Sequence, residues 1–256
     1  MNSKKMIISH KKKFIFVKTQ KVSGTSMEIA LSHSLGRKDV ITPLNLEDEV
    51  IRYKKTKKFP QNYSKDLKFE QEYKNYIRML SKKRVSKEQF NKLEKIIEDK
   101  KINNNIFFNH MKAKDIRKKV GKKIWNKYFK FSIDRNPYDK IISFMYFANR
   151  FKKIKNIQKE IQKTINLKKY INYPIYTEKK KVILDYIINY ENLRNNIKNV
   201  ENKIRIPILK HYVHTKNYTR KTKKKLKYFF NKRQSDKIFM DCNEEFKIMK
   251  FKKLYE

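Results

Sequence analysis

The chain has 256 residues, of which 39% are hydrophobic and 13% aromatic, so it can bury a core and is not a wholly disordered protein. Its 67 basic and 25 acidic residues give a formal net charge of +42, which favours polyanionic partners. Lysines are dense along the whole chain, however, so biased amino-acid usage explains the charge equally well. A single cysteine excludes an intrachain disulfide, and no apolar run reaches about 18 residues. We therefore expect a cytoplasmic protein without a transmembrane segment.

The first predicted unit is a strand, a loop and a helix. The apolar run Phe14–Val17 is typical of a buried strand, and the segment Lys21–Ser26 after it reads Lys-Val-Ser-Gly-Thr-Ser. Thr25 and Glu28 have the spacing of a capping box, which predicts a helix over about 26–35. The loop thus combines a lysine, a glycine and hydroxyl groups at the N-terminus of a helix, an arrangement that suits a phosphate group.

Residues 51–101 interrupt this pattern with a charged and helical segment. Apolar residues spaced three and four apart predict a first helix there, and the capping-box pair Ser86 and Gln89 marks the start of a second. We interpret the segment as a helical insertion. Two roles are open for it: a lid or substrate wall, or a pair of helices that only packs against the domain.

Three further strands are predicted, over Ile106–Phe108, Tyr128–Ile133 and Val182–Ile188. Helical patterns follow the first two, through Asp115–Val120 and after Pro137. Strands that alternate with helices predict an α/β fold. We expect a P-loop-like central parallel sheet flanked by helices, in a single domain over residues 1–256.

The candidate site residues share one edge of this predicted sheet. Lys21, His110 and Arg135 each follow a predicted strand, and ligands of such sheets bind beyond the carboxyl ends of the strands. The planar guanidinium of Arg135, with the hydroxyl of Ser143 eight residues later, suits a second phosphate. The sequence therefore predicts two separate anion-binding elements.

These motifs resemble those of one enzyme family. Lys21–Ser26 resembles the 5′-phosphosulfate loop of sulfotransferases that use PAPS (3′-phosphoadenylyl sulfate), and Arg135-Asn136-Pro137 with Ser143 resembles their 3′-phosphate element. His110–Ala113 resembles the histidine region of the branch that acts on carbohydrate hydroxyls. Lys140 departs from the family pattern, in which an arginine is usual.

The resemblance implies transfer of the sulfuryl group from PAPS to a hydroxyl of a carbohydrate-like acceptor. In this reading Lys21 offsets charge on the leaving phosphate, and His110 acts as the base, with Glu28 and His214 as the next candidates. No metal site is implied. The residues implied in binding the cofactor are Lys21, Ser23, Gly24, Thr25, Ser26, Arg135 and Ser143.

Two other functions remain open. A P-loop nucleotide kinase or NTPase is the first, although the motif Gly-x-x-x-x-Gly-Lys-Ser/Thr is absent and Asp134 is the nearest candidate for a magnesium ligand. A basic nucleic-acid-binding protein is the second. It explains the charge but not the two phosphate motifs, so we do not expect a nucleic-acid partner. An anionic polymer is a further candidate acceptor, for which the segment Arg220–Lys225 supplies positive charge.

Overall fold

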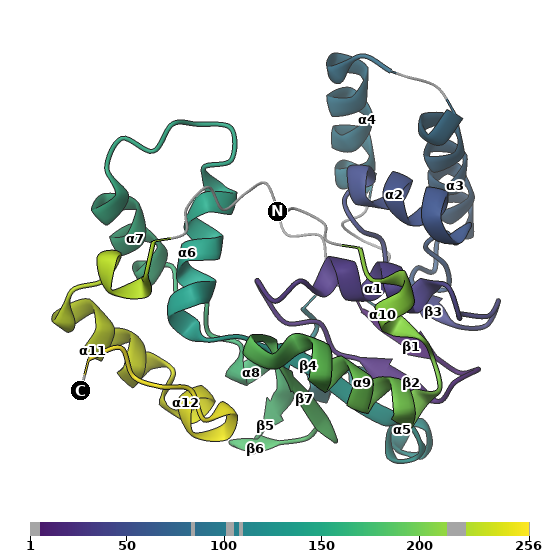
Figure 1. The fold of residues 1–256 in the computed structure, drawn as a ribbon. Helices are drawn as coiled ribbons and strands as arrows, with labels where there is room; N and C mark the ends of the chain where they lie inside the picture. The colour runs from purple at the N-terminus through teal and green to yellow at the C-terminus, as the bar shows by residue number, and fades with distance from the viewer. Residues whose placement is uncertain (1–5, 83–84, 101–104, 108–109, 214–223, 256) are drawn as a thin grey trace.

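The computed structural model describes residues 6–82, 85–100, 105–107, 110–213 and 224–255. At its centre lies a five-stranded sheet with the order β3-β1-β2-β4-β7 (Figure 1). Its strands are β1 (Ile7–Ser9), β2 (Phe14–Phe16), β3 (Val40–Ile41), β4 (Phe129–Asp134) and β7 (Tyr186–Asn189). β2, β4 and β7 pair in parallel, whereas β1 runs antiparallel to both of its neighbours. The expected α/β architecture is confirmed, with one antiparallel strand inside an otherwise parallel sheet.

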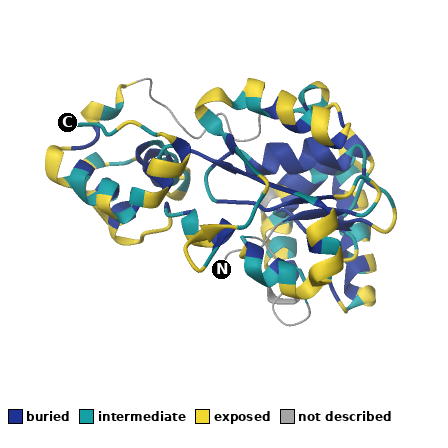
Figure 2. Ribbon diagram, turned by 90° about the horizontal axis from the view of Figure 1, so that it is seen from below, coloured by how far each residue is buried: buried dark blue, intermediate teal, exposed yellow. Residues whose placement is uncertain are grey.

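Helices cover both faces of the sheet because the side chains of β2 alternate. Phe14 and Phe16 pack with α1 (Gly24–Ser32), α9 (Leu193–Ile204) and α10 (Ile208–His211). Ile15 and Val17 face the other way and pack with α5 (Ala113–Lys127). Figure 2 shows the strands buried between these helical layers.

Two helical groups extend this core on different sides of the sheet (Figure 1). α2 (Leu46–Thr56), α3 (Leu67–Lys82) and α4 (Lys87–Lys100) share one apolar cluster. The second group is built from α6 (Pro137–Ala148), α7 (Ile157–Asn166), α11 (Lys232–Asp241) and α12 (Asn243–Met249). The shorter elements are α8 (Tyr173–Tyr176), β5 (Thr177–Glu178), β6 (Lys181–Val182), η1 (Tyr190–Asn192) and η3 (Leu226–Tyr228).

The two helices predicted within residues 51–101 are present as α3 and α4, with α2 beside them. The capping box before α4 is also confirmed. The backbone N–H of Ser86 donates to Oε1 of Gln89 at 3.1 Å, and the N–H of Gln89 donates to Oγ of Ser86 at 3.2 Å. Two backbone donors at the start of α4 are satisfied in this reciprocal way, in an exposed part of the helix.

The predicted strand over Ile106–Phe108 is wrong for the residues that the structure describes. The backbone N–H groups of Ile106 and Phe107 both donate to the carbonyl of Tyr63, at 2.8 and 3.1 Å, and neither residue joins the sheet. Phe108 lies outside the described residues. The run over 182–188 is likewise divided, because β6 ends at Val182 and β7 begins at Tyr186.

Replacing Phe131 tests the sheet core. Its fully buried ring lies 5.2 Å from the ring of Phe16 and 5.9 Å from that of Phe14, measured between centroids. Phe131→Ala should lower the free energy of unfolding by about 3–5 kcal/mol in chemical denaturation, because it leaves a cavity. Phe151→Ala is the control, since that side chain is 81% exposed, and should change stability by no more than about 0.5 kcal/mol. Equal losses in the two variants would contradict this core.

Candidate functional site

The loop after β2 gathers the residues predicted for the phosphosulfate. Lys21 and Ser23 both have left-handed backbones, with φ of 57° and 60°, and the resulting tight turn leads directly into α1 at Gly24. The first N–H groups of a helix have no acceptor within the helix, so they are donors for an anion at this end. The hydroxyl of Ser23 also donates to that of Ser26 at 3.1 Å. The loop therefore presents backbone and hydroxyl donors together.

The capping box predicted for Thr25 and Glu28 is wrong. α1 begins at Gly24, and the carboxylate of Glu28 is fully buried in an ion pair with Nζ of Lys18 at 2.5 Å. The same Nζ donates to Oγ1 of Thr25 at 3.2 Å. Glu28 thus pairs with a buried lysine rather than with its own helix terminus. The sequence does not predict the ion pair of Lys18 with Glu28, because a separation of ten residues matches no local motif.

Lys21 lies between α1 and α6. Its Nζ is 3.9 Å from the centroid of the Phe147 ring and 5.9 Å from that of Phe144. Both rings belong to α6, so the ammonium makes cation–π contacts with the helix that follows Arg135. The predicted catalytic lysine is therefore at the sheet edge, beside the second predicted element.

Arg135 follows β4 and contacts the first element directly. Its Nη1 donates to the backbone carbonyl of Lys21 at 3.4 Å, and its Cζ lies 4.3 Å from the ring centroid of Tyr190. Nε and Nη2 donate to Oδ2 of Asp139, at 2.8 and 2.5 Å. The structure thus brings Lys21 and Arg135 together, with the guanidinium engaged by Asp139. Ser143 lies further along the same helix and is half-buried.

His110 also reaches this loop, although Ile106 and Phe107, the described residues shortly before it, do not belong to the sheet. Its Nδ1 lies 3.0 Å from the carbonyl oxygen of Lys18. A carbonyl oxygen only accepts, so Nδ1 carries a proton, and in the neutral ring Nε2 is then the basic nitrogen. The contact therefore selects the tautomer that can take a proton at Nε2. His214 and residues 220–223 lie outside the described residues.

A second residue missed from the sequence is Tyr212, which follows α10. Its hydroxyl faces those of Ser23 and Ser26. Burial raises the pKa of Tyr212 to about 12, while the two serines act in the opposite direction. Tyr212 remains a neutral phenol around pH 7, and its ring packs against the apolar cluster that contains Val22 of the loop.

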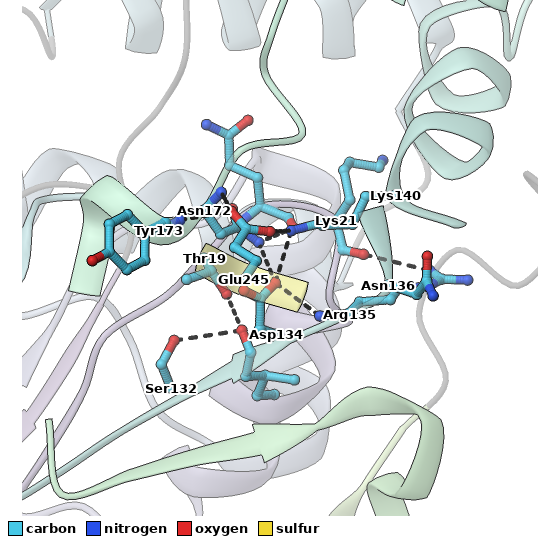
Figure 3. A network of polar contacts seen from close by, with 12 residues as sticks. Thr19, Lys21, Ser132, Asp134, Arg135, Asn136, Lys140, Asn172, Tyr173 and Glu245 are labelled. Atoms are coloured by element: carbon cyan, nitrogen blue, oxygen red, sulfur yellow. Dashed lines mark hydrogen bonds and ion pairs between the residues drawn. The ribbon is translucent and has the colours of Figure 1, made fainter. Parts of the chain in front are cut away.

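A buried polar network supports the end of β4 (Figure 3). Nζ of Lys140 lies 2.9 Å from Oδ1 of Asp134 and 2.5 Å from Oε2 of Glu245, and all three side chains are fully buried. The N–H of Arg135 donates to Oδ1 of Asp134 at 2.8 Å. This network joins β4, α6 and α12 at the residue that precedes Arg135.

Asn172 connects the same network to the first loop. Its Nδ2 donates to Oδ1 of Asp134 at 2.9 Å, and its Oδ1 accepts from the N–H of Gln20 at 2.9 Å. The hydroxyl of Tyr176 donates to Oδ2 of Asp134 at 2.9 Å. Both oxygens of Asp134 are therefore occupied by protein donors, which does not suit a magnesium ligand.

The network has more acidic than basic groups, since the carboxylates of Asp134 and Glu245 share the one ammonium group of Lys140. Burial raises the pKa of Glu245 to about 7, although Lys140 acts to lower it. Burial also lowers the pKa of Lys140, but Asp134 and Glu245 outweigh that effect and raise it overall. Lys140 therefore stays charged, and Glu245 is the member that takes up a proton as the pH falls.

One relative places the chain in a family. Over 101 residues the chain is 39% identical to an uncharacterized protein of Archaeoglobus fulgidus, a match that covers 84% of that protein and 38% of this chain. The chain belongs to the same family as this archaeal protein. No family model matches the chain, and neither does any solved structure. Because this relative is uncharacterized, membership of its family assigns no activity to the chain.

Membrane-spanning helices and metal sites can be judged for the part of the chain that the structure describes. Within it, no helix combines the length and the apolar character needed to cross a bilayer. In the same residues, no three histidine, cysteine, aspartate or glutamate side chains come together as a metal site would require.

The pH dependence of stability tests the buried network. The folded-state pKa of Glu245 is raised from 4.5 to about 7, so its contribution to the free energy of unfolding declines as the pH rises through this range. Glu245→Gln removes the titration while keeping the shape. We expect urea denaturation at several pH values to show a smaller decline for this variant.

Glu244→Gln is the matched control for that measurement, because the neighbouring Glu244 side chain is 49% exposed. It should keep the pH profile of the unchanged protein. Burial also raises the pKa of Glu191, so part of the decline persists in every variant. Identical profiles for Glu245→Gln and the unchanged protein would contradict the titration of Glu245.

Proposed function

We propose that the chain transfers the sulfuryl group of PAPS to a hydroxyl group of a carbohydrate-like acceptor. One observation carries the proposal. Two cationic elements follow the adjacent parallel strands β2 and β4, and they touch where Nη1 of Arg135 meets the carbonyl of Lys21 at 3.4 Å. PAPS has two separate anionic groups, the 5′-phosphosulfate and the 3′-phosphate. A paired arrangement of donors at the carboxyl edge of a parallel sheet suits such a molecule.

The donor set of the first element fits the phosphosulfate. Backbone N–H groups at the start of α1 and the hydroxyls of Ser23, Thr25 and Ser26 supply hydrogen bonds without charge. Lys18 and Glu28 neutralise one another, so Lys21 brings the net positive charge. The strand–loop–helix order of β2 and α1 is what supports a P-loop-like description of this sheet.

The second element fits a phosphate with one adjustment. Arg135 is 9% exposed and pairs with Asp139, so a 3′-phosphate would compete with that carboxylate for the guanidinium. Such an exchange replaces one charge-assisted contact by another. The hydroxyl of Ser143, on the same helix, is the further donor proposed for this phosphate.

The proposed chemistry is an in-line displacement. The acceptor oxygen forms a bond to sulfur as the bond between sulfur and the phosphate oxygen of the cofactor breaks. Nε2 of His110 takes the proton of the acceptor hydroxyl, and Lys21 stabilises the charge that collects on the leaving phosphate. Lys21 must turn away from Phe147 to do so, which forfeits a cation–π contact of about 0.5–1 kcal/mol.

The other two functions have less support. A kinase would need a carboxylate at the metal, and both oxygens of Asp134 are engaged by Lys140, Asn172 and Tyr176. Nucleic-acid binding would explain the charge of +42 but leaves the two convergent anion elements without a role. An anionic polymer as acceptor is compatible with the exposed Lys224 and Lys225.

Binding of PAP, the desulfated product, tests the proposal. PAP should raise the melting temperature in the presence of EDTA, with a stabilisation of about 2.7 kcal/mol at a hundredfold excess over Kd. Arg135→Ala should weaken PAP more than adenosine 5′-phosphosulfate, which has no 3′-phosphate. The control is Arg194→Ala, at an exposed position on α9. Stabilisation by ATP with magnesium but not by PAP would favour the kinase, and equal weakening of both ligands would remove Arg135 from the 3′-phosphate.

The base is tested through turnover. His110→Asn should lower turnover by about 10²–10⁴-fold and abolish the acidic limb of the pH profile, while PAP affinity stays nearly unchanged. His10→Asn is the control, since Nδ1 of His10 lies 2.8 Å from the Tyr128 hydroxyl in a different contact. Near-normal turnover of His110→Asn with the true acceptor would show that another group takes the proton.

A further inference from the structure

Lys18 touches three of the residues predicted for the site. Its side chain passes Gly24 and donates from Nζ to Oγ1 of Thr25 at 3.2 Å. Its backbone carbonyl lies 3.0 Å from Nδ1 of His110. The side chain is only 6% exposed, and its charge is matched by Glu28 at 2.5 Å. No motif points to this lysine, yet it joins the loop, α1 and the proposed base.

The glycine of the loop is required by Lys18. A Cβ placed on Gly24 would lie 2.6 Å from Cε and 2.8 Å from Cγ of Lys18, closer than real carbon contacts. Cγ belongs to the middle of the side chain, and the ammonium beyond it is held by the buried Glu28. The lysine therefore cannot move aside without disturbing that ion pair. Gly24 begins α1, so alanine could adopt its backbone conformation, and only the contact with Lys18 opposes the substitution.

We propose that Lys18 is a positioning residue of the anion-binding loop, an inference that rests on the proposed function. An ammonium group has no acceptor, so the Thr25 oxygen accepts from Lys18 and the Thr25 hydroxyl proton is left to donate to the phosphosulfate. Because Glu28 cancels its charge, Lys18 orients this hydroxyl without adding to the field. Lys18 thus orients the hydroxyl donor of Thr25, whereas Lys21 supplies the positive charge.

The Gly24 contact is tested by a paired substitution. Gly24→Ala should lower the melting temperature of the unchanged chain. In a Lys18→Ala/Glu28→Gln background, the same substitution should leave the melting temperature unchanged or raise it, because the obstructing side chain is gone and alanine favours the helix. An equal decrease in both backgrounds would overturn the inference that Lys18 requires the glycine. This readout needs no ligand.

The role in binding is tested by a double-mutant cycle with PAP as the probe. Lys18→Met/Glu28→Gln keeps the volume and leaves no unpaired charge, and Thr25→Val removes the hydroxyl. Each should weaken PAP binding about tenfold, and their combination should weaken it no further than Thr25→Val alone. Independent, multiplying effects would show that Lys18 does not act through Thr25.

The control for the cycle is Lys12→Met, whose exposed Nζ donates to the carbonyl of Arg205 and which should leave PAP affinity unchanged. Failure of the unchanged chain to bind PAP would contradict the proposed function and, with it, the role of Lys18 in binding. The melting experiment with Gly24→Ala would still decide whether Lys18 requires the glycine, so the two failures are distinguishable.

Discussion

The buried ammonium group of Lys140 lies between two buried carboxylates, and the arrangement of the candidate site depends on this contact. Asp134 ends β4 and Glu245 belongs to α12, so this contact joins the sheet to the C-terminal helices. Without Lys140, the two carboxylates would repel one another in an environment that cannot hydrate them. Because Arg135 follows Asp134 and donates its N–H to it, the same contact holds the start of the second predicted anion element.

This network contains Lys140, the residue at which the chain departs from the sulfotransferase pattern that its motifs resemble. The family usually has an arginine where this chain has Lys140, and such a change in a cofactor site would alter phosphate recognition. Here the side chain is fully buried and faces Asp134 and Glu245 rather than the loop donors. A compact ammonium suits the small space between two carboxylates. Lys140 therefore supports the end of β4 and does not contact the predicted anion-binding loop.

Local sequence patterns correctly predicted the strands and the helix that border Lys21 and Arg135. The apolar run before Lys21 forms β2, the period-2 pattern before Arg135 forms β4, and Pro137 begins α6. Since β2 and β4 pair in parallel, the residues that follow them meet, as their common position after predicted strands indicated. The adjacency of Lys21 and Arg135 was thus predictable from the sequence.

The sequence was insufficient where a side chain or a backbone group has a distant partner. Glu28 has the spacing of a helix cap, but its carboxylate forms a charge-assisted contact with the buried Lys18 instead. Ile106 resembles a strand residue, yet its N–H bonds to Tyr63, more than forty residues earlier. Asn172 is 38 residues from Asp134, and no pattern in one sequence reveals such a pair.

The most direct test of sulfuryl transfer is the release of PAP from PAPS, measured in EDTA with a panel of carbohydrate acceptors. PAP should appear only when an acceptor is present, in equal amount to the sulfated product, and Lys21→Met should abolish both. The result that would contradict it is the absence of PAP and of sulfated product with every acceptor, from a folded protein that binds or consumes ATP with magnesium.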